Sequence, residues 1–311
     1  MKRRVLALVA ILALAALAAG CNRGGGGAGG GAKQRTLGLS ISTLNNPFFV
    51  TLRDGAQTAA SKAGVKLVVT DAQNDASKQQ NDIQDFITKQ VDAILVNPVD
   101  SDAVVPAVQA ANNANIPVLA LDRGATGGKL ASLIASNNVQ GGKMAGEELF
   151  KLVKSGNVVQ LEGIPGTSAA RDRGAGFKQA LGAQSAVKLV ASQSAAFDRT
   201  KALDVFQNLL QAHPDIKGVF AQNDEMALGA VKALGARAGT SVVVVGFDAI
   251  PDALKAIQEG KMNATIAQQP AEMGRLGVET AVKVLDGQSV QPSIQIPVKL
   301  VTKDNVAQFI K

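Results

Sequence analysis

The sequence contains no tryptophan and no tyrosine, and it has one cysteine and one histidine among its 311 residues. The single cysteine, Cys21, excludes an intramolecular disulfide. The single histidine, His213, argues against a metal site built on several histidines and against a histidine proton relay. We therefore expect no metal ion in this protein. Its aromatic rings all come from 10 phenylalanines.

Motifs for common enzyme chemistries are also missing. The Gly-Lys pairs Gly128-Lys129 and Gly142-Lys143 are not followed by Ser or Thr, so neither forms a phosphate-binding loop. There is no Gly-x-Ser-x-Gly elbow, and a Ser-His-Asp triad would have only His213 to use. We therefore predict a protein that is not an enzyme and that needs no cofactor.

The charge of the chain does not favour nucleic acid. The formal net charge of +7 includes Lys2, Arg3 and Arg4. Without these three residues, 29 basic and 25 acidic residues remain, and the net charge is +4. The basic residues are scattered, and no cluster of them is interleaved with aromatic residues. We expect no nucleic-acid partner.

The first residues have the three parts of a secretory signal. Basic residues at positions 2–4 precede an apolar run, Val5–Ala19, which is shorter than the roughly 20 residues of a membrane-spanning helix. The run lacks the polar face of a buried amphipathic helix. We predict a signal peptide over residues 1–20 and export to the cell envelope, either the periplasm or the outer face of the cytoplasmic membrane.

The residues around Cys21 resemble the lipobox of bacterial lipoproteins, although Ala18 stands where that motif prefers Leu. We predict lipidation of Cys21, and simple cleavage beside an incidental thiol is the alternative. Acyl chains would contribute about 0.8 kcal/mol of membrane binding per buried methylene. A glycine tract follows the cysteine, so we interpret residues 21–35 as a flexible tether.

Beyond the tether, short strand-like runs alternate with longer helical patterns, and the rhythm repeats after Ser136. Continuous apolar strands such as Val242–Val245 indicate a parallel sheet covered by helices on both faces. The predicted fold class is α/β, with two doubly wound, Rossmann-like lobes. The predicted strands are 37–42, 66–70, 93–97, 117–122, 133–136, 158–162, 189–193, 218–222, 241–247 and 264–268. The predicted helices are 47–63, 76–89, 102–113, 138–153, 168–181, 200–212, 225–234, 251–258 and 273–285, and an apolar segment, 294–301, ends the chain.

Ligands of open parallel sheets bind at the carboxyl ends of the strands, so the polar residues there are candidates for binding. Amides, carboxylates and arginines suit sugar hydroxyls, which both donate and accept hydrogen bonds. An apolar pair, Phe48-Phe49, begins a predicted helix and can stack on a sugar ring or pack in the core. The alternatives for single polar residues are helix caps, turns or a solvated charge. The polar candidates are Ser42, Asn46, Asn97, Asp122, Arg123, Arg173, Asn223, Asp248 and Gln268. Asn45 and Asp224 lie beside them at the same strand ends, and Arg171 lies at the start of the same predicted helix as Arg173.

These motifs resemble those of bacterial periplasmic ribose-binding proteins, in order and spacing, from Thr36 to about Val301. The segments that carry the resemblance are 42–49, 97–98, 121–123, 166–171, 220–229, 245–248 and 264–268. The resemblance implies two lobes, 36–136 with 269–297 and 137–268 with 298–311, joined by a three-stranded hinge. It also implies that the sugar lies between Phe48, Phe49 and Phe197, with its hydroxyls bound by the polar candidates other than Ser42. Ser42, Ser136, Ile164 and Phe247 would complete the lining.

The function that the resemblance implies is capture of D-ribose and its delivery to an ABC permease, with a chemotaxis receptor as a further possible partner and a monomer as the expected state. One alternative is a binder of another monosaccharide, such as allose, xylose or a furanose. A remote alternative is a LacI-type regulator, but a signal and a glycine tract occupy the place of its DNA-binding helices.

Overall fold

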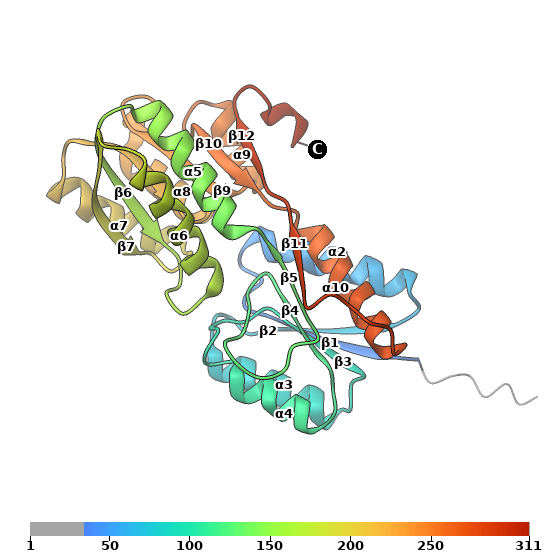
Figure 1. Cartoon of the computed structure of the whole chain (residues 1–311). Helices are drawn as coiled ribbons and strands as arrows, with labels where there is room; N and C mark the ends of the chain where they lie inside the picture. Colours follow the sequence, from blue (N-terminus) through green and yellow to red (C-terminus); the bar gives the residue numbers. More distant parts are fainter. Residues whose placement is uncertain (1–33, 311) are drawn as a thin grey trace, which may run out of the picture. The chain divides into compact units, whose positions relative to one another are not determined.

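The structure, a computed structural model, describes residues 34–310, in which strands and helices alternate along the chain (Figure 1). The predicted signal peptide, Cys21 and nearly all of the predicted tether lie outside these residues. Within residues 34–310, no helix combines the length and the apolar character that crossing a membrane requires.

The first sheet has the strand order β11-β5-β4-β3-β1-β2, and its neighbouring strands are all parallel. Its interior strands are buried on both faces, as continuous apolar runs such as Ala93–Val96 predict. The strands are β1 (Thr36–Ile41), β2 (Lys66–Asp71), β3 (Ala93–Val96), β4 (Val118–Leu121), β5 (Ser132–Ser136) and β11 (Ser293–Ile296).

Two pairs of helices cover the faces of this sheet. On one face, α3 (Ala76–Thr88) and α4 (Val105–Asn113) bury a cluster around Phe86. On the other face, α2 (Pro47–Lys62) packs against α10 (Pro270–Leu285), which comes from far along the chain. Their contact is close because Gly55 lies where a Cβ would come within 2.2 Å of the Ala271 carbonyl oxygen.

The second sheet has the order β12-β10-β9-β8-β6-β7 and is parallel except for β12, which pairs antiparallel with β10. Its strands are β6 (Gly156–Glu162), β7 (Val187–Ser194), β8 (Ile216–Ala221), β9 (Val243–Asp248), β10 (Ala264–Ala267) and β12 (Lys299–Thr302).

Helices cover both faces of the second sheet as well. On one face, α5 (Asn138–Val153) and α6 (Ser168–Gly182) pack around the stacked rings of Phe177 and Phe220. The other face carries α7 (Arg199–Ala212), α8 (Asp224–Leu234) and α9 (Pro251–Gln258). Two short 3₁₀ turns, Gly235–Arg237 and Val306–Gln308, complete the described part of the chain.

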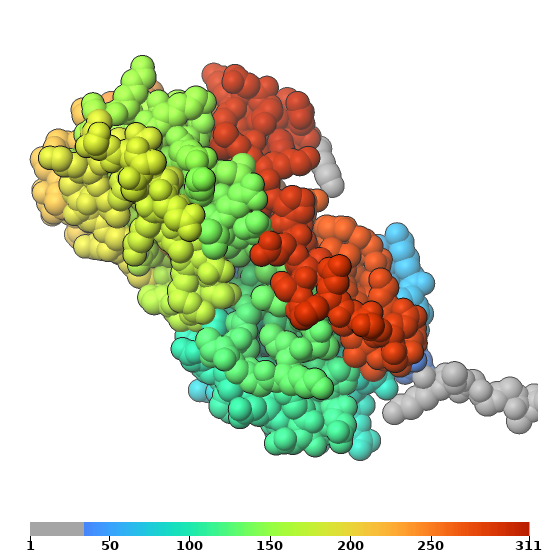
Figure 2. Space-filling view, in the orientation of Figure 1, coloured from blue at the N-terminus to red at the C-terminus, as the bar shows by residue number. Residues whose placement is uncertain are grey.

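The chain passes between the two sheets three times: from β5 into α5, from β10 into α10, and from β11 into β12. The third passage divides the segment 294–301: β11 ends just before Pro297, whose missing N–H cannot continue a ladder, and β12 pairs in the other sheet. In Figure 2 the segment that contains this passage, in red, lies on the molecular surface. The predicted fold class, two doubly wound lobes joined by three chain segments, is confirmed.

Candidate functional site

A small cavity of about 20 Å³ lies where the carboxyl ends of strands from both sheets meet. Such a volume holds about one or two water molecules. Residues of both lobes line it, and most of its lining was predicted as binding residues. The lining residues are Asn46, Phe48, Phe49, Asp122, Arg123, Ala169, Arg173, Phe197, Asn223, Asp248 and Gln268.

The first lobe contributes a charge pair directly after β4. Asp122 Oδ2 lies 3.5 Å from Arg123 Nε, and both side chains are buried. Asn97 Nδ2 donates to Asp122 Oδ2 at 3.4 Å, and Arg123 Nη1 donates to the Pro98 carbonyl at 3.1 Å. Asp122 has a positive φ of 66°, which turns the chain sharply at the sheet edge. The pair is therefore held by the residues that follow β3.

The second lobe contributes a matching pair from β9 and α6. Arg173 Nη1 lies 3.6 Å from Asp248 Oδ1, and Gln268 Nε2 donates to the same carboxylate oxygen at 2.7 Å. Arg173 is fixed by donating from Nε to Asn138 Oδ1 and from Nη1 to the Gln222 carbonyl. These two donations leave part of the guanidinium to face the cavity.

Burial dominates the electrostatics of these groups. It raises the pKa of Asp122, although Arg123, Arg173 and the hydrogen bond from Asn97 oppose the shift. Burial likewise raises the pKa of Asp248 to about 7, against the opposing effects of Arg173 and Gln268. The pKa values of Arg123 and Arg173 are lowered by the same loss of solvation. A ligand that hydrogen-bonds to the charged forms will therefore stabilise them.

Phenylalanine rings surround the charged groups. Phe48 and Phe49 meet edge to face, with centroids 5.1 Å apart, and both line the cavity. Phe197 comes from the other lobe, and the Arg123 guanidinium lies 5.2 Å from the Phe49 ring centroid and 5.3 Å from that of Phe197. Gly163 makes room for Phe197, since a Cβ there would come within 2.0 Å of the ring. The apolar faces of a sugar can stack on such rings.

Five predicted residues lie outside this lining. Asn97 accepts from the Ser42 N–H and donates to Leu121 and Asp122, so it organises the strand ends. The ring of Phe247 stacks on the Arg173 guanidinium, with Arg173 Cζ 3.8 Å from the ring centroid. Ile164 lines a neighbouring cavity of about 140 Å³ with Phe197, and Ser136 is buried where β5 ends.

The structure also decides between the readings that the sequence left open. Asn46 and Asn223 are helix caps as well as lining residues: each side chain accepts from a backbone N–H two or three residues on. Arg123 is buried, so the interpretation as a solvated loop charge is wrong. One lining residue was missed: Ala169 lies in the first turn of α6, and an alanine in that motif carries no chemical signal.

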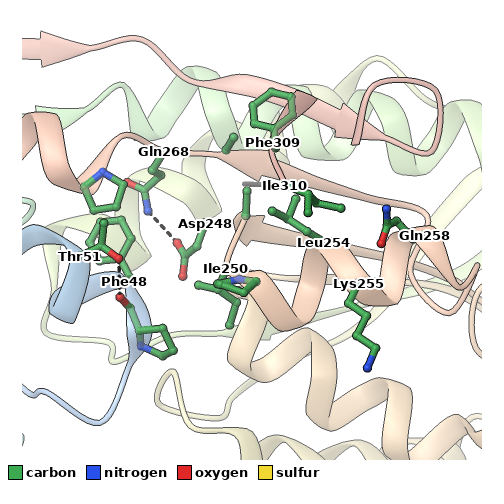
Figure 3. Close-up of a pocket in the computed structure, with 15 residues that line it drawn as sticks. Phe48, Thr51, Asp248, Ile250, Leu254, Lys255, Gln258, Gln268, Phe309 and Ile310 are labelled. Atoms are coloured by element: carbon green, nitrogen blue, oxygen red, sulfur yellow. Dashed lines mark hydrogen bonds between the residues drawn. The ribbon is translucent and has the colours of Figure 1, made fainter. Parts of the chain in front are cut away.

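A larger cavity of about 600 Å³ lies beside the small one and shares Phe48, Asp248 and Gln268 with it. Figure 3 shows these three side chains on one side of it, with Leu254 of α9 and the C-terminal Phe309 and Ile310 on the other. Its lining is mainly apolar and has no arginine. The smaller cavity is the better candidate for polar recognition because it collects the paired charges.

The chemistry of the small cavity defines the class of ligand. Two carboxylates and two guanidiniums balance in charge, which suits a neutral ligand better than a phosphate or a carboxylate. Asp122 Oδ1, Arg123 Nε and Gln268 Oε1 are buried and have no hydrogen-bond partner within residues 34–310. Buried polar atoms normally have partners, so the site suits a molecule with several hydroxyl groups. Fold and site together define a two-lobed protein that encloses a small neutral ligand.

The chain belongs to the periplasmic binding protein domain family, whose profile matches residues 37–289. The ribose import binding protein RbsB of Escherichia coli K12 is 55% identical over 269 residues, which cover 86% of this chain and 90% of that protein. The RbsB protein of Bacillus subtilis is 50% identical over 272 residues, covering 87% and 88%. A solved solute-binding protein of Actinobacillus succinogenes with bound D-allose superposes with a TM-score of 0.83 at 34% identity, covering 88% of this chain and 100% of that one.

Proposed function

We propose that the protein captures D-ribose between its two lobes and delivers it to an ABC permease. The observation that carries this proposal is the small cavity, in which Asp122-Arg123 and Asp248-Arg173 from opposite lobes meet among three phenylalanine rings. Hydrogen bonds to charged partners contribute roughly 1.5–3 kcal/mol each, so a few suffice for micromolar affinity. The identity to ribose import binding proteins supports ribose as the sugar.

In this proposal the lobes 36–136 with 269–297 and 137–268 with 298–311 move as bodies about the three connecting segments. The sugar ring lies between Phe48 and Phe49 on one side and Phe197 on the other. Ser42, Ser136, Ile164 and Phe247 support the groups that touch it. The sugar favours the closed state because it contacts both lobes only there.

We further propose that the protein works outside the cytoplasm, held to a membrane by lipid on Cys21 and by the glycine tether. It acts as a monomer, releases its sugar chemically unchanged, and in some hosts also engages a chemotaxis receptor. The family's periplasmic character supports the location.

Another monosaccharide in the same transport role is the second candidate. The solved relative with bound D-allose and a Pseudomonas aeruginosa protein named for D-ribose and D-allose, 34% identical to this chain, support allose. A solved Shewanella protein with bound arabinofuranose, 29% identical, supports a furanose. Calorimetric titration with ribose, allose, xylose and arabinose separates the candidates. We expect ribose to bind most tightly; allose as the tightest ligand would overturn the choice of sugar, and no binding to any of them would overturn the proposed function.

A further inference from the structure

The turn that carries Asp248 at the cavity has an unfavourable backbone conformation. Asp248 has φ of 123° and Ala249 has φ of 62°, so two consecutive residues with side chains take conformations that favour glycine. The turn joins the end of β9 to α9, which begins at Pro251. Strained backbone of this kind persists only where its surroundings hold it in place, so the contacts around it are informative.

The carboxylate of Asp224, the first residue of α8, fixes this turn through hydrogen bonds. Its Oδ2 accepts from the Ile250 N–H at 3.0 Å, and its Oδ1 accepts from the Thr265 hydroxyl at 2.7 Å. Thr265 Oγ1 in turn accepts from the Ala249 N–H at 3.4 Å. Asp224 is fully buried. The Ile250 N–H therefore donates to the Asp224 carboxylate directly, and the Ala249 N–H is linked to it through the Thr265 hydroxyl.

The neighbouring sequence makes room for this arrangement. Gly246 lies on β9 where a Cβ would come within 2.1 Å of Asp224 Oδ1. The preceding residue, Asn223, lines the cavity, whereas Asp224 is absent from its lining. These two adjacent residues therefore have different contacts: Asn223 lines the cavity, and Asp224 binds the turn.

We propose that Asp224 is a positioning residue for sugar binding: it clamps the turn 248–250 so that the Asp248 carboxylate stays beside Arg173 and Gln268. This inference rests on the proposed function, since it needs Asp248 to bind the sugar. Asp224 is absent from the cavity lining, and its hydrogen bonds go to the turn that carries Asp248, so we expect its effect on affinity to pass mainly through Asp248.

The test is a double-mutant cycle in ribose affinity with Asp224→Asn and Asp248→Ala. We expect Asp224→Asn to weaken ribose binding about tenfold, equivalent to roughly 1.4 kcal/mol, and to add little when Asp248 is already alanine. The direction of the change in ribose affinity separates the positioning role from a purely electrostatic effect. Burial and, after it, the charge of Asp248 raise the pKa of Asp224 well above its usual range. Any negative charge on Asp224 opposes ionisation of Asp248, so removal of that charge alone could only tighten the binding of a sugar that donates to Asp248.

A loss of equal size in both backgrounds, or tighter binding by Asp224→Asn, would overturn the positioning role. If Asp248→Ala alone leaves ribose affinity unchanged, the proposed binding site fails instead, and the two failures are distinct. Should Asp224→Asn not fold, Thr265→Val and Thr265→Ser form a matched pair. Valine removes the hydroxyl and should weaken ribose binding about threefold, while serine keeps it and should bind as the wild type does; equal affinities for the two would contradict the clamp.

Discussion

Asp248 and Arg173 form a buried pair whose members lose most of their solvation. Removing one partner of such a pair leaves the other charged and unpaired, which costs more than the pair itself contributes. The same holds for Asp122 and Arg123 in the other lobe. Single substitutions at these positions should therefore have large effects on binding.

Asp248→Ala should weaken ribose binding by about 2 kcal/mol or more, because a charged acceptor for a sugar hydroxyl is lost. Isothermal titration calorimetry measures this directly. Asp54→Ala is the matched control, since its carboxylate is exposed on α2 and remote from the cavity lining. Equal ribose affinities for the two variants would contradict the assignment of Asp248.

Ribose affinity should also depend on pH. Burial raises the pKa of Asp248 to about 7, so near this pH part of the ligand-free protein carries a protonated carboxyl. A sugar hydroxyl donates to the ionised form, so binding favours ionisation and releases protons. Affinity should therefore fall as the pH drops below 7, by at most about tenfold per pH unit.

Titrations in buffers of different ionisation enthalpy measure this proton release. The Asp248→Asn variant, which cannot titrate at this position, should lose most of the pH dependence. A wild-type affinity that stays constant between pH 5 and pH 8 would contradict the role of this carboxyl.

The sequence identified most of the residues that line the cavity, because polar residues at the carboxyl ends of parallel strands gather at one edge. It did not distinguish residues that line the cavity from residues that contact the lining, such as Asn97, which binds Asp122, and Phe247, which packs on Arg173. That difference depends on side-chain direction. The sequence placed Asp224 at a strand end but did not reveal its role, because its partners, the Ile250 N–H and the Thr265 hydroxyl, lie 26 and 41 positions away.

Gly55 of α2 and Gly274 of α10 set the distance between these two helices. Gly55→Ala would place a Cβ within 2.2 Å of the Ala271 carbonyl, so the helices must separate. We expect a fall of about 1–3 kcal/mol in the free energy of unfolding, despite alanine's better helix propensity. Gly182→Ala, near the end of α6 and with open space at the Cβ, should leave stability unchanged or raise it by up to about 1 kcal/mol.

Urea denaturation compares these variants. Equal stability of Gly55→Ala and Gly182→Ala would contradict the close packing of α2 on α10.

The two lobes also meet through two hydrogen bonds beside the cavity. Ser168 Oγ, at the start of α6, accepts from the Gly124 N–H at 2.9 Å, and the Ser101 N–H donates to the Gly166 carbonyl at the same distance. These bonds join residues of different lobes, so they contribute only to the closed state. They should slow the release of a bound sugar.

Ser168→Ala should raise the ribose dissociation constant about threefold to tenfold, the effect of one lost hydrogen bond. The α6 cap survives, because Thr167 supplies it. Thr88→Ala is the control: that hydroxyl donates to Gln84 within its own helix. If both variants bind ribose like the wild type, the contact between Gly124 and Ser168 does not stabilise closure.

Element boundaries agree with the prediction to within two residues except at the starts of two helices. The helix predicted from position 273 begins at Pro270, since proline is favoured in the first turn of a helix. The helix predicted from position 102 begins at Val105, because the Asp100 side chain accepts from the N–H groups of Asp102 and Ala103 and forms a separate turn. The last apolar segment was predicted, but its division between the sheets depends on pairing with strands elsewhere in the chain: β11 pairs with β5, 160 residues earlier, and β12 pairs with β10, 32–38 residues earlier. Local patterns carry no information on such pairing.

In the whole molecule, the cavity of about 20 Å³ is too small to admit a pentose from solvent while the lobes stay in contact. The proposed function therefore requires the lobes to separate about the three connecting segments when the sugar enters and to close again around it. It predicts an open and a closed form that interconvert.

Small-angle X-ray scattering of the purified protein with and without ribose tests this closure. We predict that saturating ribose lowers the radius of gyration of the wild type, and that the Asp248→Ala variant needs a higher ribose concentration for the same change. A radius of gyration that ribose leaves unchanged in the wild type, at concentrations where calorimetry shows saturation, would contradict capture by closure of the lobes.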